Sequence, residues 1–177
     1  MDQRHGDLPT ELTQDHQCIL EIFEEIRRTP TDSRHHERLL RHAAAELERH
    51  AIAERRFLLP ALHGLPHGDE LAHEEADEHT QLMVLLDAVT TVTPDRPGFD
   101  ARLRALELGV RRHAWRDEHA LFPMLRQICA NGDLDRLGSV FREHRVRYPA
   151  RLPEDWWCRS IGNPITTTEV ESPVDAA

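Results

Sequence analysis

The 177-residue sequence contains no lysine, few aromatic residues and only three cysteines. All 22 basic residues are arginine, against 32 acidic residues, and the formal net charge is −10. No arginine-rich stripe with interleaved aromatic residues occurs, so a nucleic-acid partner is not expected. Cys18, Cys129 and Cys158 are widely spaced and include no C-x-x-C pair, which excludes a disulfide framework and a zinc knuckle. We expect Cys18 and Cys129 to lie in helices near the core, without a redox role.

Long apolar runs are also missing. No stretch approaches the roughly 18 consecutive apolar residues that span a bilayer, and residues 1–7 contain no apolar segment of the kind found in secretion signals. Segments with the alternating pattern of β-strands are absent as well. We therefore expect an all-α, cytoplasmic protein with no membrane partner.

Helical periodicity, in contrast, runs through most of the chain. Apolar residues recur at intervals of three and four in four long segments: residues 10–28, 34–62, 69–92 and 99–130. Thr10 and Asp69 are predicted N-caps, the second helix is expected to follow Ser33, and Asn131-Gly132 is expected to close the fourth helix. Helices of this length joined by short connections predict an antiparallel up-down-up-down four-helix bundle.

The bundle is predicted to occupy residues 8–131, and residues 132–177 are predicted to form a C-terminal extension. Apolar residues within 134–141 indicate one more short helix. The adjacent Trp156 and Trp157 are expected to pack back on the bundle, because two exposed indoles are costly. Residues 163–177 are polar and contain proline, which predicts a disordered tail.

The chain repeats itself at an offset of 63 residues, and the repeat selects among its 13 histidines. Only two histidine pairs match at this offset, and residues of the predicted apolar core match with them. The recurring elements are Asp15-His16 with Glu78-His79, His50-x-x-x-Glu54 with His113-x-x-x-Asp117, and Leu58-Leu59-Pro60 with Leu121-Phe122-Pro123. Because the core repeats together with the polar residues, we predict a bundle with internal pseudo-twofold symmetry.

Residues can bind a metal inside a bundle only if they lie on the buried stripes of their helices. The candidates that do so are His16, His50, Glu54, Glu75, His79, His113 and Asp117. Three pairs among them have i, i+4 spacing, which places both members on one helix face. His42 with Glu46, and His73, lie beside the stripes and are interpreted as surface residues. Glu118 leans off the stripe and is the second choice to Asp117.

Ionised carboxylates and unpartnered imidazoles are costly to bury, and a bound dication removes that cost. Four imidazoles and three carboxylates directed to one volume are too many ligands for a single ion. Two ions bridged by carboxylates use them fully, and mixed nitrogen and oxygen donors suit iron better than the thiolate-rich sites of structural zinc. The residues therefore predict a two-iron centre.

These motifs resemble the hemerythrin family, specifically the hemerythrin-like HHE cation-binding proteins. The resemblance rests on His16, on His50-Ala-Ile-Ala-Glu54 before Leu58-Leu59-Pro60, on Glu78-His79, and on His113-Ala-Trp-Arg-Asp117-Glu118 before Leu121-Phe122-Pro123, and it covers about residues 8–131. It implies a four-helix bundle that holds a non-heme di-iron centre with an oxo or hydroxo bridge. Such a centre is expected to react with dioxygen or its relatives.

Two departures from the oxygen-carrying members of the resembling family matter. They use a His-x-x-x-His pair on the third helix, where this chain has Glu75-x-x-x-His79. Their last acid is an Asp five residues after the fourth-helix histidine, whereas here Asp117 stands at four and Glu118 at five. A carboxylate in place of an imidazole adds negative charge, which should favour ferric iron and weaken reversible oxygen carriage.

From this resemblance we hypothesise one iron held by Glu75, His79 and His113, and another by His16 and His50, with Glu54 and Asp117 bridging. The second iron, with fewer terminal ligands, would bind dioxygen, peroxide or nitric oxide. The predicted function is defence against oxidative or nitrosative stress, with peroxide decomposition or ferroxidase activity as the possible enzymatic forms. The alternative is a module that binds or senses iron, oxygen or nitric oxide without turnover. We expect a monomer or a weak homo-oligomer.

A ferritin-like carboxylate bundle is the alternative architecture. That site requires two Glu-x-x-His motifs that face inward. This chain offers only Glu70-Leu71-Ala72-His73, and His73 lies off the core stripe. The motif content therefore favours the hemerythrin-like arrangement.

Overall fold

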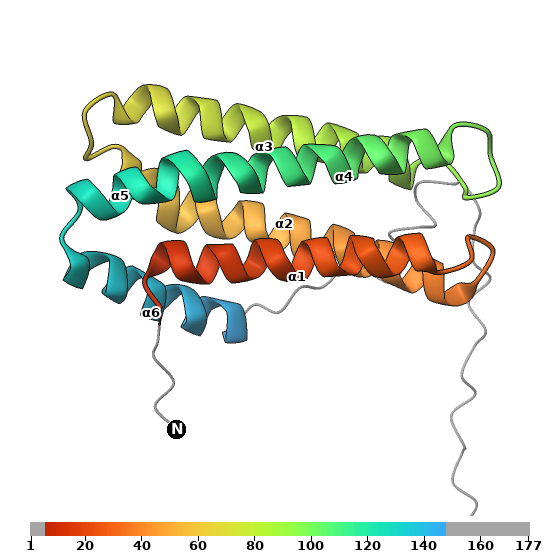
Figure 1. Cartoon of the computed structure of the whole chain (residues 1–177), viewed down its shortest axis with the longest axis horizontal. Helices are drawn as coiled ribbons and strands as arrows, with labels where there is room; N and C mark the ends of the chain where they lie inside the picture. The colour runs from red at the N-terminus through yellow and green to blue at the C-terminus, as the bar shows by residue number, and fades with distance from the viewer. Residues whose placement is uncertain (1–5, 148–177) are drawn as a thin grey trace, which may run out of the picture.

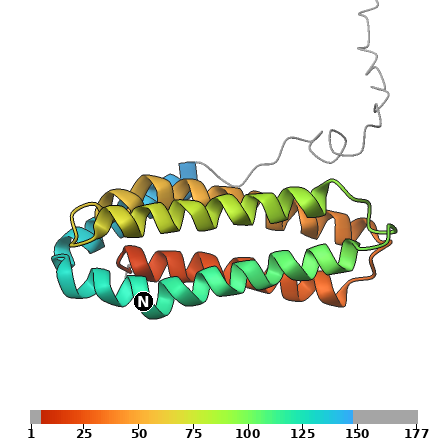
Figure 2. The same ribbon diagram turned by 90° about the horizontal axis from the view of Figure 1, so that it is seen from above.

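The computed structural model describes residues 6–147, which form helices and short connections with no strand among them (Figure 1). The elements are α1 (Leu8–Arg28), α2 (Arg34–Leu62), α3 (Gly68–Thr90), α4 (Phe99–Arg116), the π-helix η1 (Asp117–Leu121), α5 (Phe122–Ile128) and α6 (Asn131–Arg147). The four long helices alternate in direction and form two layers, α2 with α3 and α1 with α4 (Figure 2). The predicted antiparallel four-helix bundle is confirmed.

Helix starts show how local chemistry sets the boundaries. The side chain of Asp7 caps α1 by accepting a hydrogen bond of 2.9 Å from the amide of Thr10, so the prediction of Thr10 as the cap is wrong by one turn. Ser33 caps α2 as expected. Asp69 does not cap α3, which starts at Gly68 after a left-handed His67. A Cβ at Gly68 would lie 1.8 Å from the carbonyl oxygen of Leu62, so only glycine fits this close return of the chain.

The fourth helix is not continuous to residue 130, in contrast to the prediction. It widens into η1, where the amide of Phe122 bonds the carbonyl of Asp117 five residues earlier, and α5 then ends at Ile128. Pro123 has no N–H to offer the preceding turn, which favours such a widening. Asn131-Gly132 does not close this helix but opens α6.

Helix α6 spans 17 residues, longer than the short helix expected, and packs against α1 and α2 (Figure 1). Leu134 and Phe141 of α6 are buried. Gly138 lies where a Cβ would approach the carbonyl oxygen of Gly6 to 2.4 Å, so the absence of a side chain permits this contact. Trp156, Trp157 and the tail from residue 163 lie outside the described residues.

The core consists of two apolar clusters along the bundle. One gathers Ile19, Phe23, Leu47, Leu82 and Leu106 among others, and the second gathers residues such as Leu12, Phe57, Leu58, Leu121 and Phe122. Polar residues at intermediate positions on each helix separate the two clusters. Cys18 is exposed and Cys129 is half-buried, so the prediction that Cys18 lies near the core is wrong. Among residues 6–147 no helix is both long and apolar enough to cross a bilayer.

Candidate metal centre

The layer between the two apolar clusters holds all seven predicted ligands. They come from four helices and η1, each is at most 2 % exposed, and they are His16, His50, Glu54, Glu75, His79, His113 and Asp117. In helices α2 and α3 the i, i+4 spacing places both members of a pair on the inner face, as the sequence indicated. The structure therefore brings together side chains that are up to about a hundred residues apart in the chain.

One half of the cluster consists of facing imidazoles. Nε2 of His50 lies 3.2 Å from Nε2 of His16 and 3.2 Å from Nε2 of His113. Ligand atoms of these three residues and of Glu54 all lie within 4.8 Å of one another. Two donors bound at right angles to one ion, with bonds of about 2.1 Å, would be roughly 3 Å apart. This spacing suits a common cation.

The other half is richer in carboxylates. Nε2 of His79 lies 2.6 Å from Oε2 of Glu54 and 3.3 Å from Oε1 of Glu75. Glu54, Glu75, His79 and His113 form a second group whose ligand atoms lie within 4.8 Å of one another. Glu54 and His113 belong to both groups, so the two potential cation positions are adjacent.

Asp117 approaches the cluster from the π-helix. Its Oδ2 lies 3.7 Å from Nε2 of His113 and 3.9 Å from Nε2 of His16. The wider turn of η1 also lets the next residue, Glu118, reach the cluster, which a regular α-helix would direct away. Oε1 of Glu118 is 3.0 Å from Nδ1 of His16, the nitrogen opposite the one that faces His50.

The donors fit a cation better than they fit one another. Within residues 6–147, both carboxylate oxygens of Glu54 and of Asp117, Oε1 of Glu75 and both nitrogens of His79 are buried without a hydrogen-bond partner. Each such atom costs about 1–3 kcal/mol when it stays unsatisfied. Carboxylate oxygens and neutral imidazole nitrogens are ligands of divalent cations, so the buried cluster is able to bind metal.

Burial and neighbouring charges shift the pKa values of the carboxyl groups in opposite directions. Burial opposes ionisation of Glu54, but His50 and the rings of His113 and His79 outweigh it and hold the pKa of Glu54 well below its usual range. Burial and the negative charge of Glu54 raise the pKa of Asp117 well above its usual range, and the same two causes raise the pKa of Glu75.

The histidines separate in the same way. Burial lowers the pKa of His50 to about 4, which keeps this imidazole neutral at physiological pH. Burial also acts to lower the pKa of His113, but the carboxylates of Glu54 and Glu78 outweigh it and raise this pKa well above the usual range. A cation bound among these donors would displace protons from the groups whose pKa is raised.

Two carboxylates beside the cluster, Asp15 and Glu78, were not assigned a role by the sequence reasoning, which named Glu118 as the second choice to Asp117. Glu118 contacts His16 as described above. Oδ2 of Asp15 lies 3.9 Å from Nδ1 of His50, and Oε2 of Glu78 lies 3.6 Å from Nδ1 of His113. Asp15 and Glu78 are partners in the 63-residue repeat, as are His50 and His113. That pairing was the signal that could have found them.

Arg116 was also missed. Its guanidinium contacts Oε2 of Glu75 and lies 3.3 Å from Glu78 and 3.7 Å from Glu74. It stands at the end of α4 directly before Asp117, and it compensates part of the negative charge that Glu75 brings to the cluster. The 63-residue repeat contained no signal for it, because its counterpart is Ala53.

The residues that the sequence reasoning set aside lie outside the cluster. His42 is exposed, with Nε2 3.5 Å from Oε1 of Glu46. The exposed His73 bonds the carbonyl oxygen of Asp69, 2.6 Å away.

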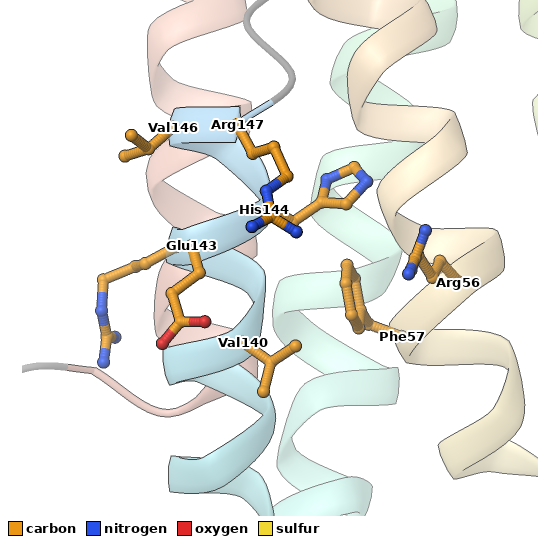
Figure 3. A pocket seen from close by; sticks show the side chains of 8 residues that line it. Arg56, Phe57, Val140, Glu143, His144, Val146 and Arg147 are labelled. Carbon is orange, nitrogen blue, oxygen red and sulfur yellow. The ribbon is translucent and has the colours of Figure 1, made fainter.

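A groove of about 650 Å³ opens on the surface between α2 and α6, and Arg56, Phe57 and Val140 contribute to its wall (Figure 3). None of the seven clustered residues lines it.

A bundle that gathers four imidazoles and three carboxylates between two apolar clusters is a cation-binding protein of the helical-bundle class. The family profile described as hemerythrin HHE cation binding domain matches residues 7–145. The chain belongs to this family, as its motifs indicated. The match includes most of α6, which the sequence prediction placed outside the bundle.

Two further proteins are similar to this chain, one in structure and one in sequence. The crystal structure of a hemerythrin HHE cation binding domain-containing protein from Mycobacterium kansasii superposes with a TM-score of 0.71 at 19 % identity, covering 88 % of this chain and 99 % of the other. A DNA nickase of Nostoc sp. strain PCC 7120 is 22 % identical over 151 residues, or 85 % of this chain. The chain spans 42 % of the length of that relative.

Proposed function

We infer that the cluster holds two iron ions and that the protein reacts with dioxygen, peroxide or nitric oxide in defence against oxidative or nitrosative stress. The observation that carries this inference is the presence of two overlapping donor groups that share Glu54 and His113. Seven buried donors exceed the needs of one ion, and two adjacent positions with a shared carboxylate suit a pair. Imidazole and carboxylate donors without thiolate favour iron over structural zinc.

In this proposal His16 and His50 hold one ion, Glu75, His79 and His113 hold the other, and Glu54 and Asp117 bridge them. The position of Asp117 supports its bridging role, because its Oδ2 lies at nearly equal distances from Nε2 of His16 and Nε2 of His113. When bound, iron supplies one-electron redox chemistry and a position for a small ligand. The chain contributes the seven donor side chains, keeps them buried from solvent and holds them in position on the helices.

The position beside His16 and His50 is the one proposed to accept the small ligand, because the proposed set gives it two terminal ligands and gives the other position three. Glu75 and Arg116 lie on the opposite side of the cluster, beside His79. Glu75 places a carboxylate where oxygen carriers of the family have an imidazole. The extra negative charge stabilises ferric iron, so we propose irreversible chemistry or sensing rather than simple oxygen transport.

Metal analysis of the purified, iron-reconstituted protein tests the core of the proposal. Two iron ions per chain, with near-ultraviolet charge-transfer absorption, are expected. His113→Ala should lose most of this iron because His113 belongs to both donor groups, whereas the exposed His42→Ala should retain it. A ratio of one iron or none per chain, or an equal loss in both variants, would contradict the two-ion assignment.

A second experiment separates turnover from binding. The reduced protein is mixed with dioxygen, nitric oxide or hydrogen peroxide, and its spectrum and the release of oxygen are followed. Repeated consumption of peroxide or ferrous iron identifies an enzyme of the peroxide-decomposing or ferroxidase kind. A stable, reversible adduct without turnover identifies the alternative, a module that binds or senses its ligand.

A further inference from the structure

Asp15 occupies a fully buried position behind His50, on the side away from the other imidazoles. Its carboxylate lies between the ring of His50 and two guanidinium groups. Oδ2 is 3.9 Å from Nδ1 of His50 and 3.3 Å from Nη1 of Arg49, and Oδ1 is 2.8 Å from Nη1 of Arg145. The three contacts form a continuous line from the surface of α6 to the cluster.

This line explains which nitrogen of His50 faces the cluster. Nε2 faces His16 and His113 at 3.2 Å, whereas Nδ1 has no hydrogen-bond partner and lies 3.9 Å from the Asp15 carboxylate. A carboxylate on the Nδ1 side favours the tautomer with the proton on Nδ1, which leaves the Nε2 lone pair for a metal. A small closing movement would convert the 3.9 Å approach into a hydrogen bond.

Arg145 is the one component of this line that comes from outside the four long helices. It lies on α6, its side chain is 31 % exposed, and it reaches a carboxylate that is 0 % exposed. Within residues 6–147, Asp15 forms ion pairs with two arginines, so without Arg145 it would keep the pair with Arg49. The orientation of the Asp15 carboxylate therefore depends on where α6 lies.

The matching position in the other half of the bundle is arranged differently. Glu78, the repeat partner of Asp15, faces Nδ1 of His113 and is paired with Arg116 of α4, 3.3 Å away. This second line stays within the four-helix bundle. Within residues 6–147, the ion pair that links an outer carboxylate to α6 lies on the His50 side, so a displacement of α6 would affect the two halves of the centre unequally.

We propose that Arg145, acting through Asp15, is a positioning residue for His50, so that the docking of α6 and the affinity of the metal centre are energetically coupled. The inference rests on the proposed function, because it requires that His50 binds a metal. Coupling of this kind is reciprocal: a contact of α6 that raises metal affinity implies that bound metal stabilises α6 by the same factor. The C-terminal helix thereby becomes a means to report or adjust occupancy.

Arg145→Gln and Arg142→Gln form a matched pair of variants. Arg142 also anchors α6, through Glu11 at 2.7 Å and the carbonyl oxygen of Gly6 at 3.0 Å, and its exposure of 24 % is similar. It contacts none of the seven clustered residues. Affinity for Co²⁺ is measured by competition with a chelator, and the visible spectrum of bound Co²⁺ reports the ligand geometry.

Arg145→Gln is expected to weaken Co²⁺ binding by roughly tenfold and to alter the Co²⁺ spectrum, because the Asp15 carboxylate loses one of its two guanidinium partners and no longer orients the His50 ring. Arg142→Gln removes an anchor of α6 but keeps the contact between Arg145 and Asp15, so it should weaken binding far less and leave the spectrum unchanged. Wild-type affinity in Arg145→Gln, or equal weakening in both variants, would overturn the inference. If the wild-type chain binds no Co²⁺ or iron, the proposed function itself fails, which is a different result.

Two more measurements test whether Arg145 acts through Asp15. In an Asp15→Asn background, Arg145→Gln should cause no further loss of affinity, since the line is already broken. Additive losses would contradict the mechanism. Should Asp15→Asn not fold, amide exchange decides: bound Co²⁺ should slow exchange in α6 of the wild type and of Arg142→Gln, and not in Arg145→Gln. Equal slowing in all three chains would overturn the coupling.

Discussion

Glu118 and His16 meet on the outer side of the cluster, where Oε1 of Glu118 lies 3.0 Å from Nδ1 of His16. The neighbouring Asp117 points to the inner side, with Oδ2 3.9 Å from Nε2 of the same ring. One imidazole thus has an acid on each of its nitrogens, supplied by consecutive residues of η1. Asp117 is fully buried whereas the side chain of Glu118 is 29 % exposed, so the two acids have different environments.

The first prediction distinguishes these two acids. Asp117→Asn should remove a direct donor and reduce the iron content from two to about one per chain. Glu118→Gln should preserve the metal content but weaken affinity by roughly 10–100-fold, because the amide supports the Nδ1–H tautomer of His16 less well than a carboxylate. Metal analysis and chelator competition measure the two effects. Equal metal loss in both variants would assign Glu118 as a direct ligand.

The second prediction concerns the stability that metal binding confers. A ligand that binds only the folded state adds about 2.7 kcal/mol to the free energy of unfolding at a hundredfold excess over its Kd. The melting temperature of the wild type and of His42→Ala should therefore rise when a divalent cation is added. His113→Ala should show little rise, because this residue belongs to both donor groups. Calorimetry with and without Co²⁺ makes the comparison, and a full rise in His113→Ala would contradict the assignment.

The fold was predictable from the sequence wherever the apolar period of 3.6 residues was uninterrupted. The stripes through Ile19 and Phe23 and through Leu103 and Leu106 place the core where the structure has it. What periodicity could not show was the widening at η1, because a π-turn changes the hydrogen-bond register without changing which residues are apolar. The exposure of Cys18 was missed for a related reason, since a small residue beside a stripe can lie on either side of the boundary.

The cluster was predictable because burial and repetition select the same residues. His16, His50, His79 and His113 all lie on apolar stripes and recur at one offset. The outer partners were harder to find, because their identity depends on contacts between helices that are distant in sequence. Arg145 and Asp15 are separated by 130 residues, and no local pattern relates them. The residue that corresponds to Arg116 in the 63-residue repeat is Ala53, which carries no charge.

The third prediction is that cation binding releases protons and weakens as the pH falls. His113 has a raised pKa because Glu54 and Glu78 outweigh its burial, and burial together with Glu54 raises the pKa of Asp117 and Glu75. All three groups hold protons more strongly than usual, and each must lose its proton to bind a cation. Affinity should therefore rise with pH, and the rise should continue above the ordinary histidine pKa of about 6.5.

Calorimetric titration with Co²⁺ in buffers of different ionisation enthalpy counts the released protons, and affinities measured across neutral pH give the slope. Glu78→Gln is the matched variant, since it removes one of the two carboxylates that raise the pKa of His113 and leaves the proposed ligands in place, so the rise in affinity should level off at a lower pH than in the wild type. A pH-independent affinity of the wild type, or uptake of protons, would contradict the prediction.

The fourth prediction tests how closely α6 is packed on the start of α1. A Cβ at Gly138 would lie 2.4 Å from the carbonyl oxygen of Gly6 and 2.9 Å from the carbonyl carbon of Asp7, which are backbone atoms that cannot rotate away. Gly138→Ala should therefore force α6 outward and destabilise the protein by about 1–3 kcal/mol. Gly132→Ala is the control on the same helix, because nothing lies within 4 Å of its Cβ position. Denaturant unfolding measures both, and the control should be neutral or slightly stabilising, since alanine favours a helix.

If α6 also supports His50 through Arg145, Gly138→Ala should weaken metal binding in proportion to the displacement, whereas Gly132→Ala should not. Wild-type stability in Gly138→Ala would show that α6 is held less closely than these distances indicate.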